Sequence, residues 1–440
     1  MQIQKLKINH YKTIEAPIEV TGFSNLHILI GPNNAGKTNV LDAIELFFNP
    51  SLDPDRYYDS RADLSLEIEL RSKQKVTISQ KEKHKEFLVN NKEAENAEEI
   101  FQEIQKRSIR IHSDDSAEKL IHERLKQFKE NYPKDYAEFC GTLQQYFDDV
   151  EISEQLFLSH VKADRKQRSI HRMGDGFRRL FIMLFYIFHP DYDIILIDEP
   201  ELHLHPSVIK KFLKILKDKS FKNQVFLTTH HSVFVQPEDI DHIWRVSRDD
   251  KRNTKVHTLA DAKEALNIER LEQEINADNS EMFFADSVLL VEGVSDRILM
   301  RGLIDRFYHG DHDIKVIYAS SKDNIDIYAS VFEAFNIPFQ VMLDRDALRG
   351  HISDVLEKAL KGSENKSEED KIEILKDQGI YVLPGVLEQN YPRRYRHKDD
   401  KKPINALRAA KKITSQDLNS TEMKTIKHIL QSLHHKSRLT

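Results

Sequence analysis

The stretch that decides the fold is HILIGPNNAGKTNVLDAIELFF, residues 27–48. It has the pattern of a short apolar strand, a turn rich in glycine and asparagine, and an amphipathic helix. Between strand and helix, the pattern GxxxxGKT is formed by Gly31, Gly36, Lys37 and Thr38. The glycines let backbone N–H groups close around phosphates, Lys37 brings a positive charge to them, and Thr38 can hold Mg²⁺. The segment therefore predicts an ATP-binding α/β domain.

Two later strands end in residues that suit the same site. IILIDEP, residues 194–200, delivers Asp198 and Glu199 at the end of an apolar strand. Asp198 can bind the Mg²⁺ shell, and Glu199 can orient a water molecule toward the terminal phosphate. VFLTTH ends in His230, which we expect to sense that phosphate.

In order and spacing, GPNNAGKTN, MGDGFRR, IILIDEPELHLHP and TTH resemble the ABC-type ATPases of chromosome-maintenance and recombination proteins. The resemblance adds Asn34 and Asn39 to the ATP contacts. It also implies that ATPase heads pair head to tail in a homodimer or higher homo-oligomer. The segment of one copy that would complete the ATP site of the other is Gly174, Asp175 and Gly176.

Some features of that family are not placed by the sequence. For its glutamine-containing loop, Gln74 and Gln80 are candidates only. The histidines of ELHLHP, His203 and His205, would share a strand face and could be read as a zinc site. A structural zinc is disfavoured, because only two ligands are present and the same wording recurs beside the ATP site of the resembling ATPases.

Composition limits the classes of protein to consider. A net charge of −6 over 440 residues argues against a uniformly basic protein, although basic stretches occur at 162–172 and 393–402. No apolar run has the length of about 20 residues that a membrane span needs, and the first ten residues lack a signal-peptide core. We therefore expect a cytoplasmic protein without a membrane partner. The single cysteine, Cys140, excludes an internal disulfide.

Strand and helix patterns divide the chain into three parts. We predict an ATPase domain over 1–275 with a helical insertion at about 91–150. A second α/β domain with a mostly parallel sheet is predicted over 276–400, followed by a C-terminal helical segment over 401–440. The alternation at 62–80 favours antiparallel strands added to the first sheet.

A second group of carboxylates lies in the second domain. FQVMLDRDAL, residues 339–348, continues an apolar strand into Asp344 and Asp346, which would face the same side of an extended chain. SVLLVEG ends in Glu292, and Asp296 follows one helical turn later. If the two strands are neighbours in a parallel sheet, these acids meet at its carboxyl edge. Their mutual repulsion then predicts Mg²⁺ or Mn²⁺ between them.

The pattern VLLVEG followed by VMLDRD resembles the Toprim domain, and an ABC-type ATPase followed by Toprim resembles the OLD (overcoming lysogenisation defect) family nucleases over nearly the whole chain. The resemblance implies a DNA endonuclease that uses a two-metal mechanism, is regulated by ATP and acts in anti-phage defence. Glu388 matches a later acidic position of the family, and Lys401 or Lys402 could stabilise charge in the transition state. A partner encoded in the same operon, such as a helicase or a reverse transcriptase, would be typical of such relatives.

Two other functions remain open on the sequence. One is a nucleotide-switched clamp that bridges DNA or a partner protein and binds metal without cutting. The other is an ATPase of recombination repair, in which loss of Lys37 is damaging and loss of Asp346 is harmless. Topoisomerase and primase are disfavoured, because the chain has no room for strand-carrying domains and no template-binding modules.

Overall fold

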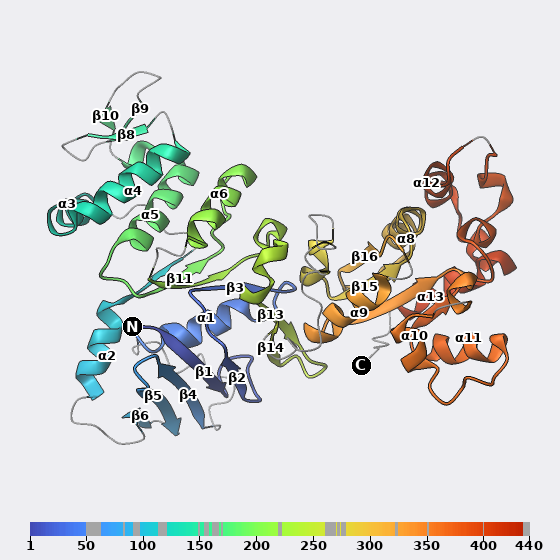
Figure 1. The fold of residues 1–440 in the computed structure, drawn as a ribbon, viewed down its shortest axis with the longest axis horizontal. Helices are drawn as coiled ribbons and strands as arrows, with labels where there is room; N and C mark the ends of the chain where they lie inside the picture. Colours follow the sequence, from blue (N-terminus) through green and yellow to red (C-terminus); the bar gives the residue numbers. More distant parts are fainter. Residues whose placement is uncertain are drawn as a thin grey trace. The chain divides into compact units, whose positions relative to one another are not determined.

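The computed structural model divides the chain into two compact units, residues 1–235 with 239–260, and residues 236–238 with 261–440 (Figure 1). The residues that it describes are 1–49, 63–81, 84–90, 97–112, 121–147, 150–153, 158–160, 167–168, 170–218, 222–259, 270, 273, 279–321, 324–349, 352–398 and 400–433. The predicted boundary at 275/276 lies outside these residues.

The central sheet of the first unit has the strand order β14-β13-β3-β12-β11-β7. Its strands are β3 (Leu26–Ile30), β7 (Ser108–Ile111), β11 (Ile194–Asp198), β12 (Gln224–Thr228), β13 (Ile243–Arg248) and β14 (Thr254–Thr258). All neighbours pair in parallel except β13 and β14. β3 and β12 are buried along their whole length, as expected of parallel strands that are covered on both faces.

Helices cover both faces of this sheet (Figure 1). α1 (Lys37–Glu45) lies on one face, and α5 (Asp175–Phe188) and α6 (Pro206–Leu216) lie on the other. Because α1 starts where β3 has just ended, the phosphate loop sits at the carboxyl edge of the sheet.

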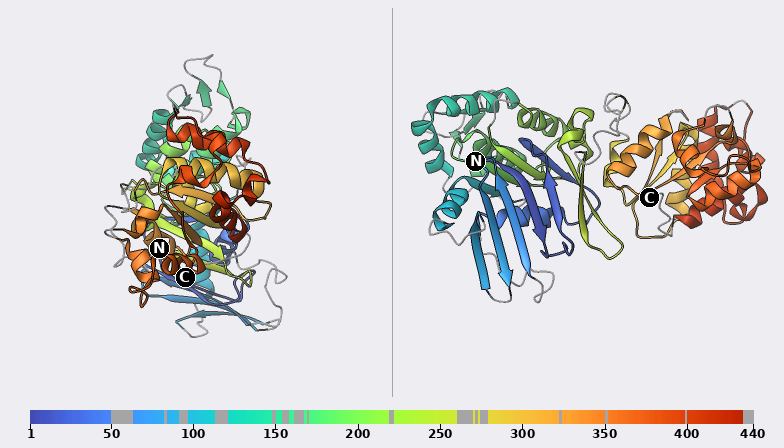
Figure 2. Two further views of the ribbon diagram at one scale, coloured as in Figure 1. Left: turned by 90° about the vertical axis from the view of Figure 1, so that its right-hand side faces the viewer. Right: turned by 60° about the horizontal axis from the view of Figure 1, so that its bottom comes forward.

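A separate five-stranded antiparallel sheet packs on the far side of α1. Its strands are β1 (Ile3–Asn9), β2 (Ile18–Thr21), β4 (Leu64–Leu70), β5 (Lys75–Lys81) and β6 (His84–Val89), in the order β2-β1-β4-β5-β6 (Figure 2). Alternate residues of β4 are buried, so the period-two reading is confirmed. These strands pair with β1 rather than extending the phosphate-loop sheet, because their apolar face covers α1.

The range expected to be a helical insertion also contains a strand. It holds α2 (Ala97–Lys106), α3 (Ile121–Asn131) and α4 (Pro133–Tyr146), but β7 runs between α2 and α3 and joins the central sheet beside β11. Only four residues long and set among charged residues, β7 gives a weak sequence signal. A small sheet of β8 (Val150–Ile152), β9 (Leu158–His160) and β10 (Gln167–Arg168) follows; most of the basic stretch 162–172 lies outside the described residues.

The second unit has a four-stranded parallel sheet in the order β16-β15-β17-β18. Its strands are β15 (Ser287–Val291), β16 (Ile314–Tyr318), β17 (Phe339–Leu343) and β18 (Ile380–Val382). α8 (Val294–Phe307) connects β15 to β16 and α9 (Ile325–Ala334) connects β16 to β17. Since the two crossovers run in opposite directions along the sheet, right-handed connections put these helices on opposite faces (Figure 1). α10 (Asp354–Ala359) and α11 (Glu368–Asp377) lie between β17 and β18 in sequence.

The last two helices belong to the core of this unit. α12 (Lys402–Lys412) packs on α8, and α13 (Lys424–Ser432) buries the side chains predicted to share its apolar face. These are Met423, Ile426, Leu430 and Leu433. The Arg306 guanidinium of α8 donates to the carbonyl oxygens of Ala410 (2.5 Å) and Ile413 (2.7 Å). None of the helices in the described ranges has the length and apolar character needed to cross a bilayer.

Candidate ATP site and candidate metal site

The phosphate loop has the backbone that its glycines predict. Gly31 and Gly36 have φ angles of 136° and 104°, values that side chains disfavour. A Cβ on Gly31 would lie 2.0 Å from the carbonyl oxygen of Val246, and one on Gly36 would lie 2.3 Å from Oγ1 of Thr254. Both conformation and space therefore require glycine at these two positions.

Lys37 is buried beneath the loop. Its Nζ donates to the carbonyl oxygens of Gly31 and Pro32, each at 2.9 Å. Burial lowers the pKa of Lys37 to about 8, against the opposing influence of Glu199 and Glu201. Bound phosphates would raise this pKa again, because nearby anions favour the protonated amine.

The loop's other predicted contacts surround Lys37. Thr38 and Asn34 are exposed, and Asn34 has a positive φ of 59°. Asn39 donates from Nδ2 to Oγ1 of Thr13 at 2.6 Å, so its amide connects the start of α1 to the segment between β1 and β2. Thr38 can hold Mg²⁺ from this position, whereas Asn39 already has a structural role.

The predicted Mg²⁺ ligand Asp198 is held from two sides. The Thr228 hydroxyl donates to its Oδ1 at 2.5 Å, and Arg110 of β7 lies 3.2 Å from its Oδ2. The Arg110 side chain is only 4% exposed and also pairs with Asp42 and Glu45 of α1, the latter at 2.6 Å. This buried arginine neutralises acids from two elements at once, and the sequence reasoning missed it.

Glu199, predicted to orient a water molecule, and His230, predicted to sense the terminal phosphate, lie next to each other. His230 Nε2 lies 3.4 Å from Glu199 Oε1, and Glu199 has a positive φ of 48°. Burial, and then the positive charge of Lys37, lower the pKa of His230 and favour its neutral form. Glu201 accepts from the Thr229 hydroxyl and from the backbone N–H of His230, both at 2.8 Å, so it fixes the segment that carries His230.

The segment Gly174–Gly176 starts α5, with Gly174 as its N-cap. Apart from Gly174 and its two neighbours in the chain, no atom of the described residues lies within 4 Å of a Cβ built on Gly174, so they leave this helix start open. A Cβ on Gly176 would lie 2.4 Å from the carbonyl oxygen of His203, so glycine lets ELHLHP pack against the helix. Asp175 is largely exposed and pairs with Arg178.

Arg179 of the same helix connects this segment to the ATP site. It donates to the carbonyl oxygens of Asp198 (2.6 Å), Glu199 (3.0 Å) and His112 (2.9 Å). The guanidinium is buried and holds the ends of β7 and β11 together. Nothing in the sequence distinguishes Arg179 from the adjacent Arg178.

The remaining ATP-site candidates have structural explanations. His205 caps α6, its Nδ1 accepting from the backbone N–H of Ser207 at 3.3 Å, which agrees with the reading against zinc. Gln74 lies between β4 and β5, and Gln80 lies on β5. Neither belongs to a strand of the phosphate-loop sheet, where β7 takes the place beside β11.

At the carboxyl edge of the second sheet, acids from distant parts of the chain converge. β15 and β17 pair in parallel with Val291 opposite Met342, so Glu292 and Asp344 leave the sheet side by side. Glu292, Asp344 and Asp346 each place a carboxylate oxygen within 4.8 Å of the others. The backbone N–H of Asp344 donates to Glu292 at 3.5 Å.

Asp346 reaches this group by a different route from the predicted one. β17 ends at Leu343, and Asp346 lies in a 3₁₀ helix, Arg345–Leu348, not on an extended strand. The tighter turn brings its carboxylate back toward Asp344, while Arg345 pairs with Glu368 at 2.5 Å and Glu369 at 3.1 Å. The convergence was predicted, but the strand geometry proposed for it was wrong.

Burial and the neighbouring acids raise the proton affinity of Asp344. Burial raises the pKa of Asp344 to about 7, with further increases from the charges of Asp296, Glu292, Asp346 and Glu388. Its Oδ1 atom is buried and has no hydrogen-bond partner among the described residues. A buried acceptor among acids is where a divalent cation would bind, and an all-oxygen donor set suits Mg²⁺ or Mn²⁺.

Asp296 and Glu388 flank the three converging acids. The Asp296 carboxylate accepts from the backbone N–H of Gly293 at 3.1 Å and caps the start of α8; burial raises its pKa to about 6. Glu388 follows β18 in a short 3₁₀ helix, Leu387–Asn390, and Lys402 Nζ lies 3.7 Å from its carboxylate. The structure thus brings Lys402 to this neighbourhood, although its side chain is 71% exposed.

Two family models match the chain. One, described as an AAA domain, putative AbiEii toxin, Type IV TA system, matches residues 26–121 and 51–236; the other, described as the overcoming lysogenization defect protein-like TOPRIM domain, matches residues 283–346. The chain thus carries an ATPase domain followed by an OLD-like Toprim domain, in the order predicted from the sequence. The first match covers the phosphate loop and its partner residues, and the second covers Glu292, Asp296, Asp344 and Asp346.

Several curated relatives of this chain carry nuclease names. The OLD nuclease of Thermus scotoductus is 29% identical over 203 residues, 44% of this chain and 37% of that protein. Endonuclease GajA of Bacillus cereus strain VD045 is 24% identical over 298 residues, 64% of this chain and 46% of that protein. Each match therefore spans less than half of the relative's length. Among solved structures, the SMC head domain from Thermotoga maritima aligns at 17% identity with a TM-score of 0.43, over 58% of this chain and 98% of that chain.

Part of the basic stretch 393–402 is engaged in contacts within the second unit. Arg394 pairs with Asp417, and Arg396 Nε donates to the carbonyl oxygen of Tyr391 at 3.1 Å. Arg393, Lys398, Lys401 and Lys402 are exposed, and of these Lys402 pairs with Glu388.

Proposed function

We propose that this protein is an ATP-regulated DNA endonuclease that requires a divalent cation, cuts at its Toprim site and serves in anti-phage defence. The observation that carries the proposal is the convergence of Glu292, Asp344 and Asp346 around a buried carboxylate oxygen without a hydrogen-bond partner among the described residues. Acids held this close are costly unless cations sit between them. The nuclease names of the relatives support phosphodiester hydrolysis as the reaction.

In this proposal the three converging acids hold Mg²⁺ or Mn²⁺, with Asp296 and Glu388 as further ligands. Bound cations supply activation of a water molecule and stabilisation of the leaving oxygen. The chain's own residues orient the ligands: Glu292 accepts from the N–H of Asp344, and Asp296 fixes the turn after Glu292. Lys402 brings an amine beside Glu388, from which it can offset charge on the phosphate.

The ATPase unit would control this reaction. Lys37, Thr38 and Asp198 would bind Mg²⁺-ATP, and Glu199 with His230 would position water at the terminal phosphate. The open helix start at Gly174 supports its use by the ATP of a second copy, so we propose a homodimer or higher homo-oligomer. A helicase, a reverse transcriptase or another partner from the same operon would fit the defence role.

Plasmid cleavage tests the proposal. Supercoiled DNA is incubated with the full chain in Mg²⁺, Mn²⁺ or EDTA, with and without ATP. We expect cleavage in a divalent cation and none in EDTA. Asp344→Ala should reduce the rate by at least about 100-fold, because loss of a ligand exceeds the effect of losing a supporting group. Asp311→Asn, an exposed acid on the loop after α8, is the matched control and should cut normally.

Two further results separate the alternatives. Lys37→Ala should make cleavage insensitive to ATP while the requirement for a divalent cation remains. Absence of cleavage in every cation, together with nucleotide-dependent DNA bridging, would instead establish the clamp. Full cleavage by Asp344→Ala would contradict the assignment of the reaction to the Toprim acids.

A further inference from the structure

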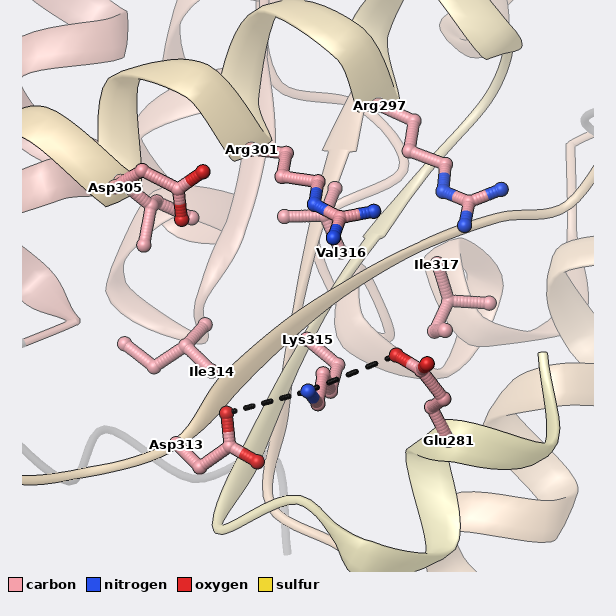
Figure 3. Close-up of a pocket in the computed structure, with 10 residues that line it drawn as sticks. Glu281, Arg297, Arg301, Asp305, Asp313, Ile314, Lys315, Val316 and Ile317 are labelled. Carbon is pink, nitrogen blue, oxygen red and sulfur yellow. Dashed lines mark ion pairs between the residues drawn. The ribbon is translucent and has the colours of Figure 1, made fainter. Parts of the chain in front are cut away.

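A groove on the second unit is formed by α8 and the edge strand β16, and encloses about 110 Å³ (Figure 3). A phosphate group fits this volume, since a single water molecule needs only about 10–15 Å³ of such space. None of the residues that line the groove was predicted to belong to the ATP site or to the metal site.

Basic side chains from both elements line the groove. Arg297 and Arg301 project from α8 toward the groove, and Lys315 comes from β16 (Figure 3). Arg297 and Arg301 are four residues apart, so they occupy one helix face with Cβ atoms about 5–6 Å apart. Two guanidinium groups at this spacing can each present a planar pair of donors to a phosphate.

The acids of the groove are arranged differently. Glu281 and Asp313 lie on the wall opposite α8, where both pair with Lys315 at 3.6 and 3.5 Å (Figure 3). The single amine offsets one of the two carboxylates, so that wall keeps one net negative charge. On the α8 wall, Arg301 is exposed and has no ion pair among the described residues, and the acid there is Asp305.

The groove and the metal site are connected through neighbouring residues of the chain. Arg297 directly follows Asp296, and its guanidinium lies 5.3 Å from the centre of the Tyr318 ring. Tyr318 ends β16 opposite Val291, the residue before Glu292. One end of the groove is thus at the carboxyl edge where the acids converge, and Arg301 and Lys315 lead away from it along the sheet edge.

We propose that the α8 wall of this groove, through Arg297 and Arg301, binds backbone phosphates of the DNA next to the one that is cut. The inference rests on the proposed nuclease function and adds to it the path of the substrate. Since the contacts are to phosphates, the groove holds and orients DNA without reading its sequence.

The test is the salt dependence of DNA binding. Binding of a short labelled duplex is measured from about 50 to 200 mM salt, with Asp344→Asn present in every protein so that cleavage does not interfere. Arg297→Gln with Arg301→Gln should weaken binding roughly tenfold and reduce the slope of log K against log salt by about 1 to 2, as each lost phosphate contact contributes about 0.9. The matched control, Lys361→Gln with Lys366→Gln, removes two exposed charges between α10 and α11 and should keep the slope.

A second pair of substitutions guards against a folding defect. Arg297→Lys with Arg301→Lys keeps both charges and should keep most of the slope while weakening binding through loss of the paired donors. Equal slopes for the glutamine pair and the unsubstituted protein would overturn the inference, as would equal losses in the groove and control pairs. So would variants that alter competition by pyrophosphate but leave the DNA slope intact, since the groove would then bind small phosphates.

Failure of this inference is distinguishable from failure of the proposed function. Suppose that the unsubstituted protein cuts plasmid and that the groove variants bind DNA with the same salt slope as the unsubstituted protein. The groove assignment alone is then wrong. If the groove variants lose slope but no cation supports cleavage, the groove stands as a DNA contact and the nuclease proposal falls.

Discussion

The ATP site and the Toprim site both gather acids at the carboxyl edge of a sheet, but they compensate them differently. In the first unit, Arg110 pairs with Asp42, Glu45 and Asp198 from a buried position. In the second unit, burial and the neighbouring acids all raise the pKa of Asp344. One acid cluster is paired with a cation of the chain, whereas the other, in the proposed function, would be compensated by cations from solution. The difference would suit a site that stays folded while nucleotide exchanges, and a site whose chemistry depends on bound metal.

The largest effect is expected from removing the built-in cation. Arg110→Gln would leave three acids without it in a buried place, a change that costs about 3–5 kcal/mol. Unfolding in urea can be followed by the fluorescence of Trp244, the single tryptophan, which is buried in the first unit. The control Arg107→Gln removes a partly exposed arginine that pairs with Asp193 and should cost about 1 kcal/mol or less. Equal losses of unfolding free energy in the two variants would show that burial of Arg110 contributes nothing to stability.

Arg179 is expected to have the next largest effect, on both stability and turnover. Arg179→Gln would leave the carbonyl oxygens of Asp198, Glu199 and His112 without their donor, at a cost of about 2 kcal/mol by the same fluorescence measurement. Because these hydrogen bonds fix the backbone that carries Asp198 and Glu199, the rate of ATP hydrolysis should fall as well. Arg172→Gln, an exposed arginine before α5, should change neither quantity.

In the Toprim site, we expect a substitution to raise the stability of the fold rather than to lower it. Asp344→Asn removes a repelling charge, so in EDTA we expect the melting temperature of the second unit to rise by a few degrees, or about 1 kcal/mol. Mg²⁺ should stabilise the unsubstituted protein and should stabilise Asp344→Asn much less. Scanning calorimetry with Asp311→Asn as control measures both shifts. A lower melting temperature for Asp344→Asn in EDTA would mean that the acids are already compensated.

The smallest expected effect is a pH dependence of the stability difference between Asp344→Asn and the unsubstituted protein. The folded pKa of Asp344, about 7, lies above its unfolded value near 3.8, so the folded state binds more protons between these values. Stability from this group is therefore present below the unfolded pKa and falls as pH rises toward 7. In EDTA the stability gap between Asp344→Asn and the unsubstituted protein should widen from pH 6 to pH 8. A constant gap would contradict the raised pKa.

Motifs with strong local patterns predicted most of the fold and much of the candidate site. The phosphate loop and the strands before Asp198, Glu292 and Asp344 each combine an apolar run with a change of residue type, which a single sequence shows clearly. Their meeting at sheet edges followed from the rule that parallel strands end together.

What the sequence did not predict depends on contacts between distant segments. β7 is four residues long, and its pairing with β11 joins residues more than 80 positions apart. Arg110 and Arg179 acquire their roles only through that pairing and through the packing of α5. The 3₁₀ turn at Asp346 was missed because DRDAL continues an apolar strand without a glycine or proline to mark its end.

The packing of α12 against α8 affects how the Toprim unit can be isolated. A Cβ on Gly302 would lie 2.7 Å from the Cβ of Ala410, so the two helices touch with almost no side chain between them. A recombinant fragment ending at residue 400 would strip this contact and the α13 face from the interior, and it would also lose Lys402. Anyone dissecting nuclease from ATPase should therefore place the cut upstream of Ser280 and keep the tail through Leu433, or risk mistaking an unfolded fragment for an inactive enzyme.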